Sequence, residues 1–212
     1  MARSRRSTPI QKRSQQTIDE ILDAAAQLLD RDGYHAVSTN QIAKHAHLSI
    51  GTVYRYFDNK DAIVVALRAR TEDDIMRRLV AALAEGLALD AVVGARHVLS
   101  ALVDALEDHR GVMGAVINDL PLGIQSNVLP TIEGHLHHLA RLALLQHYPH
   151  LSDTEVDEIL YLGMGMMLQV ALRIAVDRPP AMRKESLLDR AAALAVSANA
   201  ILGAQSGADA ST

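Results

Sequence analysis

The chain has 212 residues, of which 49% are hydrophobic and 22% charged, so it carries enough apolar material for the core of one or two ordinary domains. It contains no cysteine, which excludes disulfides and thiolate metal sites. No apolar run approaches about 18 residues without a charge, and the N-terminus has no apolar stretch, so we expect a cytoplasmic protein with neither a transmembrane span nor a secretory signal.

The net charge of −4 is unevenly distributed. Residues 1–60 hold nine Lys or Arg against six Asp or Glu, a balance of +3, whereas the rest holds 12 against 19, a balance of −7. Five of the basic residues, Arg5 and Arg6 among them, fall in the first 13 positions, where there is no acidic residue. We expect residues 1–14 to be a disordered arm with a polyanionic partner; a solvated tail without a partner is the alternative.

The chain is predicted to be all-α, because no segment alternates apolar and polar residues between turn signals. The first helix is expected from about Thr17, where TIDEILDAAAQLLDRDG places its apolar residues on one face. Thr17 with Glu20 has the spacing of a capping box, and a start one turn earlier is the alternative. Gly33 can end this helix in the left-handed conformation that glycine adopts at little cost.

Two very short helices follow. Ser38 with Gln41 again has capping-box spacing, and Ser49 can cap a helix that runs to about Tyr56 or Phe57. Asp58 or Asn59 can then cap the next helix. Three helices, with a tight turn between the second and the third, form a helix-turn-helix over residues 15–60.

The third helix, which is the second of the two short ones, has two distinct faces. At 100° per residue, Val53 and Phe57 point toward the core, whereas Gly51, Thr52 and Arg55 point outward. Tyr54 and Tyr56 lie on the two flanks. A helix in a DNA major groove needs small or donor side chains toward the bases and hydroxyls toward the phosphates, and this helix offers both. Tyrosines that merely border a small core are the alternative.

The segment AxxLLxxxGYxxxSTxxIAxxAxLSxGTVYRYFxNKxA, within residues 21–67, resembles the DNA-binding domain of the tetracycline-repressor (TetR) family. The resemblance implies that DNA is contacted from the second helix, the recognition helix and the start of the fourth helix, by Thr39, Asn40, Ile50, Gly51, Thr52, Tyr54, Arg55, Tyr56 and Lys60. The wheel places Ile50 nearer the core than the groove. His47 stands where the family usually has glycine, so we expect a left-handed backbone there.

Long amphipathic helices are predicted over the larger domain, residues 61–204, with breaks near Gly86 and Gly111. A short helix is expected over 112–119, and Pro130 should break or begin a helix. After a capped start at SDTEVDE a strongly apolar helix follows, and a final helix spans about 182–203. Together with the first domain this makes about nine helices, followed by a disordered tail over 205–212.

The segment ILYLGMGMMLQVALRIAV, residues 159–176, is apolar nearly all round, so it must be buried on most sides. An ordinary core helix is one explanation. The resemblance favours the other, a homodimer through the last two helices of each chain, and two copies would read a palindromic site.

The larger domain carries no motif of a hydrolase, a P-loop or a dinucleotide site, and we predict neither an enzyme nor a cofactor. A histidine-rich stretch over 135–150 has one pair at metal-binding spacing, a minor possibility. An aliphatic cavity would suit a small lipophilic effector. Its candidate lining residues, chosen by position and chemistry, are Met113, Ile117, Asn118, Gln125, His135 and Met166.

The sequence therefore predicts a dimeric, ligand-responsive DNA-binding regulator, most simply a repressor, with operator DNA and a small molecule as partners and no membrane. Two alternatives stay open. One is a DNA-binding dimer without an effector, and the other is an all-helical metal- or lipid-binding protein.

Overall fold

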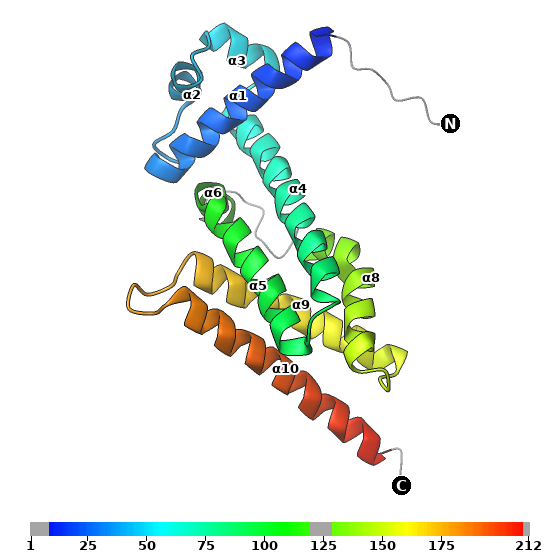
Figure 1. Ribbon diagram of the computed structural model, residues 1–212. Helices are drawn as coiled ribbons and strands as arrows, with labels where there is room; N and C mark the ends of the chain where they lie inside the picture. Colours follow the sequence, from blue (N-terminus) through cyan, green and yellow to red (C-terminus); the bar gives the residue numbers. More distant parts are fainter. Residues whose placement is uncertain (1–8, 119–128, 210–212) are drawn as a thin grey trace, which may run out of the picture. The chain divides into compact units, whose positions relative to one another are not determined.

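The computed structural model describes residues 9–118 and 129–209, with side chains over 12–114 and 136–197. Within this part of the chain all regular structure is helical, with nine helices and no strand, as expected from the sequence (Figure 1). The helices form two compact units. One takes residues 1–71 together with 111–121, and the other takes 72–110 and 122–212.

The first unit is built on the predicted three helices. They are α1 (Pro9–Asp32), α2 (Thr39–His45) and α3 (Ile50–Tyr56), followed by the first part of α4 (Lys60–Gly86) and by α6 (Arg110–Asn118), which joins from Gly111 onward. Their common core buries side chains from all of these helices: Ile21, Leu28, Ile42, Val53, Ile63, Leu67 and Val112. Helices of seven residues are not stable alone, so α2 and α3 depend on their packing against this core.

The helix starts of this unit follow the capping signals of the sequence. Ser38 forms a complete capping box with Gln41, and the Ser49 hydroxyl accepts a hydrogen bond from the Thr52 amide. The Asn59 side chain accepts one from the Ala62 amide at the start of α4. These predictions are confirmed.

α1 differs from the prediction at its start. It begins at Pro9, eight residues before Thr17, because proline fits the first helical position and QKRSQQ consists mostly of good helix formers. The Thr17 hydroxyl donates to the Arg13 carbonyl inside the helix instead of capping it. The end is as expected, with Gly33 at φ +76°.

α6 also differs from the prediction. The chain breaks at His109, which caps α5 (Ala91–Asp108), and not at Gly111. Gly111 instead lies so close to α1 that a Cβ atom there would be 2.4 Å from the Asp30 Cα. With Val112 in the core, this contact adds α6 to the first unit, whereas the sequence divides the chain into contiguous domains.

The second unit packs α5 against α9 (Asp153–Ala175) and α10 (Lys184–Asp209), and α8 (Leu129–His147) against α9. In Figure 1, α9 and α10 are joined by a loop and both lie beside α5. Ser152 caps α9 with a capping box, as predicted, and Pro130 lies in the first turn of α8. α10 stays helical to Asp209, beyond the predicted end near 203.

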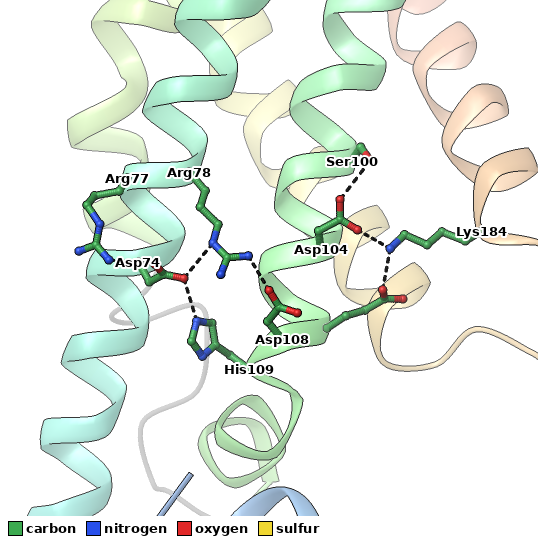
Figure 2. Close-up of polar contacts among 9 residues, drawn as sticks. Asp74, Arg77, Arg78, Ser100, Asp104, Asp108, His109 and Lys184 are labelled. Carbon is green, nitrogen blue, oxygen red and sulfur yellow. Dashed lines mark hydrogen bonds and ion pairs between the residues drawn. The ribbon is translucent and has the colours of Figure 1, made fainter. Parts of the chain in front are cut away.

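Ion pairs connect the helices of the second unit (Figure 2). Arg78 of α4 lies between Asp74, 2.9 Å from its Oδ2, and Asp108 of α5, 2.6 Å from its Oδ2. His109 Nε2 lies 3.0 Å from the same Asp74 Oδ2. Lys184, at the start of α10, donates to Asp104 and Glu107 of α5. These contacts connect the middle of α4 and the start of α10 to the C-terminal part of α5 within this unit.

Among the described helices, α9 alone is long and apolar enough to cross a membrane by length and composition. It buries eight side chains within the unit, including Val156, Ala171 and Ala175. A core helix passes the same test of length and composition.

Candidate nucleic-acid interface

The recognition helix α3 is held by its inner face. Val53 is fully buried and Phe57 packs against the same core, as the wheel predicts. Gly51, Tyr54 and Arg55 are exposed and Thr52 is half-buried, so the outward residues of the prediction form one surface. Ile50, placed nearer the core by the wheel, is 37% exposed and belongs to that surface too.

α2 contributes to this surface through its first turn. The Thr39 hydroxyl lies 3.3 Å from the Tyr54 hydroxyl, which brings two of the predicted DNA residues together across α2 and α3. Asn40 is exposed beside Thr39. Two hydroxyls and an amide therefore lie next to the free face of α3, and such groups bind phosphate oxygens.

The Thr52 hydroxyl already has a hydrogen-bond partner at the start of its own helix. It lies 2.8 Å from the Ser49 hydroxyl, which also caps the Thr52 amide at 3.1 Å. The cap therefore fixes the rotamer of Thr52 before any ligand arrives. This pair was not singled out from the sequence, although the S-x-x-T spacing carries the signal.

Tyr56 lies on the other flank and faces α1. A hydrogen bond with the Ser14 hydroxyl lowers the pKa of Tyr56, and a bond from Arg55 adds to the shift. Arg55 Nη2 lies 3.1 Å from the Tyr56 hydroxyl, and the guanidinium lies 4.9 Å from the ring centre. The Tyr56 hydroxyl must therefore share these partners with any phosphate that it contacts.

The turn between α2 and α3 has the backbone that the sequence predicts. His47 has φ +56°, in the left-handed region that favours glycine, and its side chain is exposed. The His47 amide donates to the Lys44 carbonyl at 3.2 Å and the Leu48 amide to Ala43 at 2.9 Å, so the tight turn is closed by backbone bonds.

Lys60 is less free than the resemblance implies. Its ammonium donates to the Tyr34 carbonyl at 2.8 Å in a partly buried position, and lies 3.9 Å from the centre of the Tyr34 ring. This partner was missed from the sequence, although the GY that follows α1 and the NK at the start of α4 both belong to the segment that resembles the family.

The basic arm is only partly described. Arg5 and Arg6 lie outside the described residues, whereas Lys12 and Arg13 are part of α1. The positive charges of Lys12 and Arg13 are therefore carried by a helix.

The predicted effector residues are not brought together. Met113 is buried, and Met166 is 58% exposed on α9. Gln125 and the side chains of Ile117, Asn118 and His135 lie outside the described part of the chain. A hollow of about 800 Å³ lies between α1 and α2, next to Gln27, Arg31, Lys44 and His45, and contains none of these residues.

In the histidine-rich stretch, His137 Nε2 lies 3.6 Å from Asp157 Oδ1. Arg141 Nη1 forms an ion pair with the same oxygen. Within the side chains that the structure covers, no group of three or more His, Asp or Glu could hold a metal ion.

Comparisons with known proteins agree with this geometry. Residues 21–67 match the family of bacterial regulatory proteins of the tetR type. The uncharacterised helix-turn-helix regulator YvkB of Bacillus subtilis is 34% identical over 97 residues, 46% of this chain and 49% of that protein. The fatty acid metabolism regulator protein of B. subtilis is 36% identical over 70 residues, 29% of this chain and 36% of that protein.

The chain thus spans about half the length or less of these curated relatives. The fold extends further, since a tetR-family regulator from Mesorhizobium loti superposes with a TM-score of 0.65 at 18% identity, covering 90% of this chain and 98% of the other. By the matched segment and the capped α2–turn–α3, residues 21–67 carry the helix-turn-helix domain found in the tetR family of bacterial regulatory proteins, and the chain as a whole resembles that family in fold.

Proposed function

We propose that this protein regulates transcription as a repressor by binding operator DNA with α3 in the major groove. The observation that carries the proposal is the asymmetry of α3, which buries Val53 completely while it exposes Gly51, Tyr54 and Arg55. Gly51, Thr52 and Arg55 would approach base edges, where an arginine can bind guanine with two hydrogen bonds.

The phosphates on either side would be bound by the flanking groups. Tyr54 and Thr39, with hydroxyls 3.3 Å apart, and Asn40 would bind one phosphate wall. Tyr56 would bind the other, in competition with Ser14. The arm with Arg5 and Arg6 would add charge near the duplex, and charge of this kind raises affinity for every sequence.

The protein would act as a homodimer through α9 and α10, in the cytoplasm. Exposed apolar side chains lie on these helices: Tyr161, Leu162, Met166 and Leu194, with Tyr161 73% and Leu194 70% exposed. Gly163 and Gly165 have open space where a Cβ would lie, so packing within the protomer does not require glycine at either position. A second copy would cover this face and bring two α3 helices to a palindromic site.

A small lipophilic effector would release the DNA. The support is the aliphatic composition of the larger unit and the name of the B. subtilis relative, a fatty acid metabolism regulator. Met113, Ile117, Asn118, Gln125 and His135 stay candidates for its site. Met166, exposed on the proposed dimer face, is the weakest of the six.

α4 offers a route for the effect, because this single helix of 27 residues contributes to both units. An effector that binds one position of α4 better than another shifts the population of DNA-competent dimers, and can do so only by that difference in affinity.

The DNA proposal is tested by selecting duplexes from a random-sequence pool with the purified protein, then measuring affinities for the selected duplex and for a scrambled one. Arg55→Lys should reduce the affinity for the selected duplex by roughly tenfold and leave the scrambled one nearly unchanged, because a base contact carries sequence information. Tyr54→Phe should weaken both alike. If selection with the wild-type protein enriches no sequence over the starting pool, the proposed function is wrong.

The dimer is tested by sedimentation. Met166→Asp and Leu194→Asp each place a charge on the proposed interface and should give folded monomers. Glu158→Gln, at an exposed position of α9, is the control and should stay dimeric. If both aspartate variants remain dimeric, the dimer interface does not lie on this face of α9 and α10.

The effector proposal is tested by titrating long-chain fatty acids and their acyl thioesters against the protein–operator complex. Whichever compound releases the DNA must bind more weakly, by the same factor, when saturating operator is present. If the compound binds with equal affinity with and without operator, its binding is not coupled to DNA binding, and the protein would be a DNA-binding dimer without this effector response.

A further inference from the structure

Arg55 and Tyr56, neighbours in α3, are in direct contact. Arg55 Nη2 donates to the Tyr56 hydroxyl at 3.1 Å, and the guanidinium carbon lies 4.9 Å from the centre of the Tyr56 ring. Consecutive residues of a helix do not face each other, so the Arg55 side chain must turn from the outward face of α3 toward its flank to make this contact. The cation therefore lies on the Tyr56 side of the exposed surface.

The Tyr56 ring is itself held by the core of the first unit. Its side chain is half-buried and packs against the buried cluster that contains Val53, whereas Arg55 is exposed. The Tyr56 hydroxyl has a second partner in Ser14 of α1. An exposed arginine without a fixed neighbour exchanges among many rotamers. Arg55 has such a neighbour, because the ring that it contacts is held in place.

The contact leaves the guanidinium able to read a base. A guanidinium has several N–H donors, of which the Tyr56 hydroxyl uses one, and the remaining donors include a pair that guanine O6 and N7 can accept. Because the hydroxyl accepts this hydrogen bond, its own proton stays available for a phosphate oxygen. The same tyrosine can thus bind a phosphate and orient the neighbouring arginine.

We infer that Tyr56 determines specificity through Arg55: its ring and hydroxyl hold the guanidinium in position for the base pair that Arg55 reads. This role is additional to the phosphate contact of the hydroxyl, and it rests on the proposed function. Ordering one long side chain on binding lowers affinity by roughly two- to tenfold, and a side chain that is held beforehand avoids part of that loss. The gain applies only to duplexes that Arg55 reads, so it is measured as sequence preference.

The experiment measures preference as the ratio of the affinities for two duplexes that differ at one base pair. The first is the duplex selected by the wild type, and the second is changed at the base pair whose preference is lost in Arg55→Ala. Tyr56→Leu should lower the ratio about two- to fivefold, the contribution of an exposed cation–π contact. Tyr56→Phe keeps the ring, so it should weaken the binding of both duplexes and retain most of the preference.

Tyr54→Leu is the matched control. It removes a tyrosine from the other flank of α3, where the hydroxyl lies 3.3 Å from that of Thr39. It should weaken the binding of both duplexes and leave the ratio unchanged. In an Arg55→Ala background, Tyr56→Leu should not lower the ratio further, because the ring acts on the base pair only through Arg55.

A measurement without DNA decides whether Tyr56 holds Arg55. In the free full-length protein, the NMR order parameter of the Arg55 Nε–H bond should fall in Tyr56→Leu and stay as it is in Tyr54→Leu. If Tyr56→Leu does not fold, Tyr56→Met serves in its place, since its flexible apolar side chain adapts to the gap left by the ring.

An unchanged preference in Tyr56→Leu overturns the inference, as does an equal loss of preference in Tyr54→Leu. An Arg55 order parameter that stays constant when the ring is removed overturns it as well. Failure of the wild type to select any duplex would instead refute the proposed function. The order parameter of the free protein would still decide whether the ring restricts Arg55.

Discussion

Replacing His47 by glycine should stabilise the protein. Among the described non-glycine residues, His47 alone has a positive φ, at +56°. A left-handed backbone costs a residue with a Cβ roughly 1–2 kcal/mol. Glycine removes that cost but makes the unfolded chain more flexible, at about 0.5–1 kcal/mol. The net gain is about 0.5–1 kcal/mol, since the exposed imidazole contributes little packing.

The assay is thermal unfolding of the full-length protein, where about 2–4 °C per kcal/mol converts this gain to roughly 1–4 °C for a chain of this size. Ala36→Gly is the matched control, because Ala36 is exposed in the other turn of the same unit and has no positive φ. There glycine brings only the flexibility of the unfolded chain, so the midpoint should fall. If both variants shift the midpoint in the same direction, the left-handed backbone of His47 does not carry the cost assigned to it.

Two other substitutions test the packing. Gly111→Ala should destabilise by about 1–3 kcal/mol in urea unfolding, because its Cβ would lie 2.4 Å from the Asp30 Cα and the backbones must separate; a change within 0.5 kcal/mol would contradict this contact. Asp74→Asn should cost about 1 kcal/mol at pH 7, since the hydrogen bond with His109, and then Arg78, hold the pKa of Asp74 below its ordinary 3.8. A lowered pKa stabilises the fold above about pH 3.8, and that stability is lost as pH falls through the lowered value, so the two proteins should converge in acid; a constant difference would refute the assignment.

Local signals in the sequence predicted the helix-turn-helix well. Ser38 and Ser49 cap their helices as expected, as does Ser152 in the second unit, because an N-cap depends on residues within three positions of it. The buried Val53 was likewise predictable from the helical period, whereas the left-handed His47 was implied by the resemblance, because the family usually has glycine at that position.

Features that depend on distant residues were not predicted. The membership of α6 in the first unit depends on the contact of Gly111 with Asp30, 81 positions away, and nothing near Gly111 indicates it. The engagement of Lys60 depends on Tyr34, 26 positions earlier. The resemblance indicated that Lys60 matters without showing which partner it has.

The contribution of α6 to the first unit has a consequence for modular evolution. Val112 is 2% exposed in the core that supports the recognition helix, yet 39 residues of the other unit separate it from Thr71. A fragment ending at Thr71 would lack this side chain and leave an apolar gap beside α1. Recombination that gives this DNA-binding unit a new effector domain must therefore also supply a segment equivalent to Gly111 and Val112, with a glycine small enough to lie against α1. The two segments of the DNA-binding unit, which are separated in the sequence by part of the other unit, must therefore be transferred together.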